Sequence, residues 1–66
     1  MNDYEKIQLM RQRCESMILA MLGVEAALKW WNSKNYAFDM KTPLEMIDLD
    51  PQRVYTYIIG HVDGYG

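Results

Sequence analysis

Two signals for the start of an α-helix follow each other closely in the stretch MKTPLEMIDLDP, and they restrict the fold more than any other feature of the chain. Thr42 can cap a helix by accepting a hydrogen bond from a free backbone N–H, and Pro43 suits the first helical position, where its missing N–H costs nothing. Asp50 and Pro51 repeat this signal, and a residue that precedes a proline is pushed out of the α region. The stretch therefore predicts a short helix from Pro43 to about Asp48, a corner, and a new helix that begins at Pro51.

The residues before this corner predict two more helices. From Tyr4 to Leu22, apolar residues recur at steps of three and four, as they do on one face of an amphipathic helix. Gly23 follows, and glycine inside a helix costs about 1 kcal/mol relative to alanine. We therefore expect a break at Gly23 and a second helix over Val24–Asn32, because one continuous helix would leave too little of the chain to cover it.

The remaining segments complete an all-α chain. The segment after the second helix loses the helical period and indicates a loop, to which Tyr36 and Phe38 add apolar anchors. The last helix is expected from Pro51 to about Val62, with Gly64–Gly66 as a frayed tail. Its apolar face consists of Val54, Tyr55, Ile58, Ile59 and Val62. We predict one domain over residues 1–66, a small bundle of about four helices in which residues 1–22 supply the longest.

The apolar content of the chain is high for its size. Half of the 66 residues are hydrophobic, including six Met, five Tyr and two Trp, although a chain of this length buries only about 60% of its unfolded surface. We therefore expect some apolar residues to lie at an interface. One candidate, suited to the core or to a self-association seam, is a stripe on the first helix that consists of Ile7, Met10, Cys14, Met17 and Met21. The stripe continues through Val24, Leu28 and Trp31.

Trp30 has two possible roles. It cannot share the direction of Trp31, because neighbouring residues on a helix point about 100° apart. Trp31 lies on the apolar stripe and is expected in the core. Trp30 either covers the loop that carries Tyr36 and Phe38 or stays exposed as an anchor for a partner.

The charged and reactive residues argue against several classes of function. Seven Lys and Arg against nine Asp and Glu give a net charge of −2 without a basic block, so we expect no binding to nucleic acid. Cys14 is the only cysteine and lies on the apolar stripe, and His61 is the only histidine. We therefore expect no catalytic residue, no metal site and no cofactor. The longest apolar run is far too short to cross a membrane, and cysteine usage suits the cytoplasm.

An ordered set of residues from Gly23 to Gly66 matches the pattern of a known family. The matching residues are Ala27, Trp30, Trp31, Asn35, Phe38, Thr42, Pro43, Leu44, Glu45, Met46, Ile47, Val54, Ile58, Val62 and Gly64. In this order they resemble the toxin-binding domain of the Xre/MbcA/ParS antitoxin family. The corner and the tail depart from the family pattern: Asp50 and Pro51 replace a glycine at the corner, and Asp63 replaces an aromatic residue before the tail glycine.

The resemblance implies a protein that neutralises an enzyme and is not itself one. The family's partners are toxins of the RES type, which consume NAD, and related enzymes, and the antitoxin blocks the entrance to the active site. The surface expected to bind the partner consists of Trp30, Tyr55, His61, Asp63, Gly64, Tyr65 and Gly66. Too few residues precede the match for the helix-turn-helix domain that many relatives carry, so we expect a toxin-binding domain on its own, dimeric or bound to a partner.

Two other functions stay open. The altered tail and the missing DNA-binding part also suit a stand-alone, phage-encoded regulator or inhibitor that binds an unrelated host protein. A toxin-like gene beside this one would favour the antitoxin instead. The third possibility is a self-assembling structural module built through the stripe on the first helix.

Overall fold

Four α-helices and one short 3₁₀ turn make up the described part of the chain, in a computed structural model that covers the backbone of residues 2–65 and the side chains of residues 2–61. The elements are α1 (Asp3–Leu22), α2 (Val24–Trp31), the 3₁₀ turn η1 (Tyr36–Phe38), α3 (Pro43–Leu49) and α4 (Pro51–Tyr65). The predicted all-α bundle with a long N-terminal helix is confirmed.

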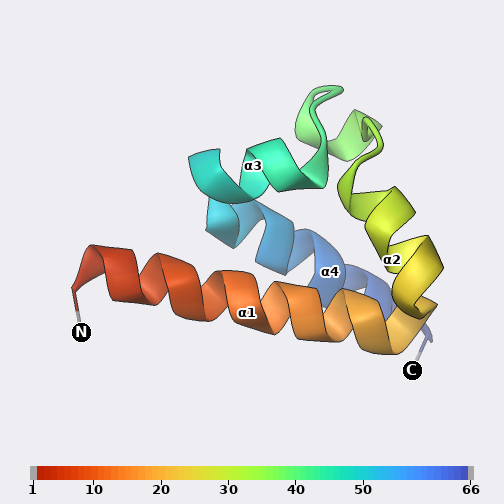
Figure 1. Cartoon of the computed structure of the whole chain (residues 1–66), viewed down its shortest axis with the longest axis horizontal. Coiled ribbons are helices and arrows are strands. Elements are labelled where there is room, and N and C mark those ends of the chain that lie inside the picture. Colours follow the sequence, from red (N-terminus) through yellow and green to blue (C-terminus); the bar gives the residue numbers. More distant parts are fainter. Residues whose placement is uncertain (1, 66) are drawn as a thin grey trace.

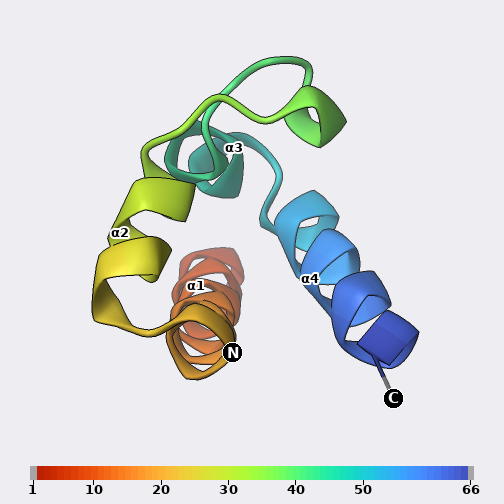
Figure 2. The same cartoon turned by 90° about the vertical axis from the view of Figure 1, so that its right-hand side faces the viewer.

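The long helix α1 forms the base of the bundle (Figure 1). Both α2 and α4 pack against α1 and against α3. Figure 2 looks along α1 and shows α2 and α4 on opposite sides of it, with α3 between them at the top. The core lies inside this arch and consists of Cys14, Ile18, Ala27, Trp31, Phe38, Met46, Ile47, Val54 and Ile58.

The helices around the corner begin at the caps that the sequence predicts. Thr42 Oγ1 accepts a hydrogen bond from the Glu45 N–H at 3.1 Å, and Pro43 occupies the first turn of α3. Asp50 Oδ1 accepts a hydrogen bond from the Arg53 N–H at 3.2 Å at the start of α4. Because these local bonds fix the end of one helix and the start of the next, they set the direction in which α4 runs back over α1.

Gly23 separates α1 from α2, as predicted. Its φ of 83° and ψ of 171° lie in a region that only glycine adopts easily, and its N–H donates to Leu19 O at 2.9 Å to close α1. The predicted continuation of the apolar stripe into α2 is wrong at Val24 and Leu28, which are 65% and 61% exposed. The break at Gly23 turns α2 so that Trp31 faces the core and these two side chains face outward.

The loop between α2 and α3 is held down by Phe38 and Arg53. Phe38 is fully buried, whereas Tyr36 is 90% exposed, so its predicted role as an apolar anchor is wrong. In a 3₁₀ turn, residues two positions apart point to different sides, and only one of the two can face the core. Arg53 of α4 donates to Asp39 Oδ2 at 3.0 Å and to Ala37 O at 2.8 Å, which ties η1 to the bundle.

The last helix is longer than the sequence predicts. It runs to Tyr65, although an end near Val62 and a frayed tail were expected. Val54 and Ile58 are buried as predicted. Val62 was predicted on the same face, but its side chain lies outside the described residues. None of the described helices combines the length and the apolar character that crossing a membrane requires.

Candidate functional site

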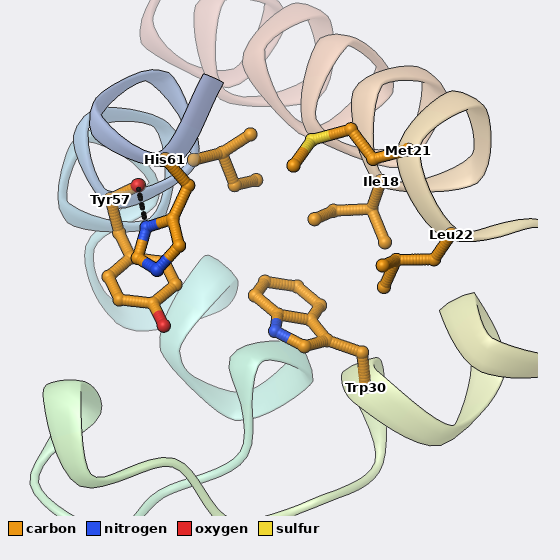
Figure 3. Close-up of a pocket in the computed structure, with 7 residues that line it drawn as sticks. Ile18, Met21, Leu22, Trp30, Tyr57 and His61 are labelled. Atoms are coloured by element: carbon orange, nitrogen blue, oxygen red, sulfur yellow. Dashed lines mark hydrogen bonds between the residues drawn. The ribbon is translucent and has the colours of Figure 1, made fainter. Parts of the chain in front are cut away.

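A recess of about 480 Å³ opens between the C-terminal end of α1, Trp30 of α2 and the second half of α4. We call it the Trp30 pocket. It is lined by Ile18, Met21, Leu22, Trp30, Tyr57, Ile58 and His61. Figure 3 shows the aliphatic side chains of α1 facing the indole ring across the recess, with Tyr57 and His61 on the side of α4. Side chains of three helices therefore line one mostly apolar recess.

Trp30 reaches the pocket because α2 ends with two adjacent tryptophans. Trp31 fills the core, and Trp30 meets it edge-on with ring centroids 5.0 Å apart. Trp30 also packs edge-on against Phe38 at 6.3 Å and lies nearly parallel to the ring of Tyr57 at 6.4 Å. Trp30 thus covers the loop through Phe38, which was one of its two predicted roles, and its half-buried ring also forms a wall of the pocket.

Tyr57 and His61 lie one turn apart on α4, and their rings are 4.2 Å apart. His61 Nδ1 lies 3.0 Å from Tyr57 O. Because a carbonyl oxygen only accepts, a hydrogen bond here requires the tautomer that carries its proton on Nδ1. The pocket therefore combines mostly apolar walls with an imidazole ring at its edge, an arrangement that can orient a ligand side chain.

The one cysteine of the chain lies away from the Trp30 pocket. Cys14 is fully buried in the core, outside the pocket, and burial raises the pKa of its thiol to about 11, with a smaller contribution from the Glu15 carboxylate. A thiol with this pKa is neutral at physiological pH and a poor nucleophile. Within the part of the chain that the structure describes, no group of three or more His, Cys, Asp or Glu could hold a metal ion.

The structure brings only some of the predicted partner-binding residues together. Trp30 and His61 share the pocket, but Tyr55 lies on the other flank of α4, beside Leu9 and Arg13 of α1. Residues 57 and 61 form one flank of this helix and residues 55 and 59 the other, because successive residues turn by about 100°. The side chains of Asp63 and Tyr65, together with Gly64 and Gly66, lie outside the described residues.

Sequence reasoning missed Tyr57 and Leu22 as pocket residues. The spacing of Tyr57 and His61 at i and i+4 was a usable signal for a shared helix face. For Leu22 no local signal existed, since its role depends on how α1 and α4 cross.

The stripe predicted for self-association belongs mainly to the core. Cys14 is fully buried, Met10 and Met17 pack against the core, and Ile7 is half-buried. Met21 is the most exposed of the set and lines the Trp30 pocket. Self-association itself stays a prediction, but this stripe offers little free surface for it.

No protein-family model, no curated protein and no solved structure significantly matches this chain.

Proposed function

We propose that the chain is a non-catalytic protein-binding module that neutralises a toxin by covering the entrance to the toxin's active site. The observation that carries this proposal is the Trp30 pocket, an open apolar recess of about 480 Å³. Sites that hold a ligand or an anchoring side chain commonly measure about 300–1,000 Å³ and have mostly apolar walls. Aromatic residues such as Trp30 and Tyr57 are frequent energetic centres of protein interfaces.

The sequence resemblance supplies the class of partner. It suggests a RES-type or related enzyme that acts in the cytoplasm, approached by the end of the molecule that carries α4. Direct chemistry by the chain itself is disfavoured because the only described hydrogen bond of His61 goes to a backbone carbonyl. An inhibitor of an unrelated host protein would use the same pocket, and the identity of the captured partner separates these two functions.

The test begins with a chain that carries a tag at its N-terminus and is incubated with native host lysate. The captured enzyme is then identified and purified. Titration of that enzyme with the chain should give full inhibition when each molecule of chain has bound one molecule of enzyme. Met21→Glu puts a charge into the pocket wall at a partly exposed position, and it should weaken inhibition by at least tenfold, because burying an unpaired charge is costly.

Leu49→Glu is the matched control, since Leu49 is 67% exposed on α3 and does not line the pocket. Equal inhibition by Met21→Glu and wild type would contradict the role of the pocket. Deletion of residues 63–66 tests the tail separately: the resemblance predicts loss of neutralisation with retained helical structure. An inhibited enzyme of another class would support the host-protein inhibitor, and capture of this chain alone would support self-assembly.

A further inference from the structure

An apolar surface on the outer side of α2 is not used by the core or by the Trp30 pocket. We call it the α2 face. Val24 and Leu28 project from it one turn apart, and Leu19 of α1 and Leu44 of α3 extend it across neighbouring helices. These side chains border a groove of about 370 Å³, whose floor is Ala27 and Trp31 and whose polar edge is Glu15 and Asn32. Monomeric proteins seldom leave such a cluster uncovered without a function.

Two side chains of opposite charge lie beside these apolar residues on α2. Glu25 lies in the first turn of α2 and Lys29 in the last, and both are exposed. Among the residues with described side chains, neither forms an ion pair. The α2 face therefore has an apolar row flanked by a negative and a positive group one turn apart.

We propose that the α2 face binds a second copy of this chain, with the two α2 helices antiparallel about a twofold axis. Such an axis joins a surface to itself, so each contact occurs twice. An axis that runs between the two α2 helices, level with positions 26 and 27, puts Glu25 of each copy beside Lys29 of the other, to within the rise of one residue, about 1.5 Å. The same axis puts Val24 of each copy against Leu28 of the other.

The charge pattern selects a second copy over other occupants because the face is complementary to itself only in this antiparallel arrangement. A parallel arrangement would place the charged flanks of the two copies on opposite sides of the contact, where no ion pair forms between them. The surface that a two-turn helix and two neighbouring leucines can bury is smaller than the roughly 800 Å² that each partner buries in stable complexes. We therefore expect a reversible dimer with a dissociation constant on the order of micromolar.

The dimer leaves the Trp30 pocket open in both copies. The groove of the α2 face is lined by side chains of α1, α2 and α3, and it shares no lining residue with the pocket, whose lining comes from α1, α2 and α4. This inference does not rest on the proposed function, since it requires no partner other than the chain itself.

Sedimentation equilibrium over a wide range of concentrations tests the proposal. The mass of the wild type should rise from that of one chain, 7.8 kDa, towards twice this value. Leu28→Glu should remain at the mass of one chain, and the control Leu49→Glu, with a similarly exposed leucine on α3, should dimerise like the wild type. Far-UV circular dichroism shows that each variant is folded.

Charge reversal gives the sharper result. Glu25→Lys and Lys29→Glu should each weaken the dimer by about tenfold, because each removes both ion pairs and creates like-charge contacts. The double variant should recover most of the affinity, and an equimolar mixture of the two single variants should form a mixed dimer. A wild type that stays monomeric, equal behaviour of Leu28→Glu and Leu49→Glu, or no recovery in the double variant would overturn the proposal.

Discussion

Gly23 and Gly60 are expected to affect stability in opposite directions. At neither position does a described atom beyond the adjoining backbone lie within 4 Å of the place where a Cβ would lie. Gly23, however, has a φ of 83° at the turn between α1 and α2, whereas Gly60 lies inside α4. The difference between the two positions is therefore one of backbone conformation and not of space.

We expect Gly23→Ala to lower the free energy of unfolding by roughly 1–3 kcal/mol, the usual cost of a strained backbone position. Gly60→Ala should raise it by about 0.5–1 kcal/mol, because alanine loses less conformational entropy in a helix. Urea denaturation followed by circular dichroism measures both values. A shift of the same sign in the two variants would show that the conformation at Gly23 is not what separates the first two helices.

At the scale of the elements, the local signals of the sequence proved sufficient to place the helices. The caps at Thr42 and Asp50 and the break at Gly23 depend only on residues close in the chain, and all three were predicted. The faces of the elements were predicted less well. Tyr36 and Leu28 are exposed because the orientation of a short element is set by what it packs against, and no local pattern contains that information.

The contact between α4 and the loop after α2 predicts a pH dependence. The hydrogen bond and the charge of Arg53 hold the pKa of Asp39 below its ordinary value of 3.8. A carboxyl whose pKa is lowered by folding stabilises the fold above its unfolded pKa, and this stabilisation is lost as the pH falls through the folded pKa. We therefore expect this contribution to be complete above about pH 5 and to decline at more acidic pH.

The measurement is the urea midpoint as a function of pH for the wild type and for Asp39→Asn, which keeps the size of the side chain but cannot titrate. The difference between the two should shrink as the solution becomes acidic, and it should also shrink in high salt because both side chains are exposed. Parallel pH profiles of the two proteins would mean that the bond between Arg53 and Asp39 does not stabilise the loop.

At the scale of the molecule, the Trp30 pocket could not be predicted in full because it depends on how three helices cross. Trp30 and His61 were singled out separately, but the ring of Tyr57, which connects them, was not. The fold also separates two apolar surfaces, since the pocket and the groove of the α2 face share no lining residue. The two proposed binding events therefore do not compete for the same side chains.

Phe38 is the largest fully buried side chain among the described residues, and it contacts Trp30 and Tyr57 edge-on. Truncation of a buried phenylalanine to alanine costs about 3–5 kcal/mol, and a core in a chain below about 70–80 residues seldom supplies more than that. We therefore expect Phe38→Ala to lose its helical circular dichroism signal throughout the chain. The matched control is Tyr36→Ala in the same 3₁₀ turn, which should leave stability unchanged because Tyr36 is 90% exposed. Retention of a full helical signal by Phe38→Ala would show that α1, α2 and α4 hold together without the loop, and only then could this variant be used to probe the pocket independently of folding.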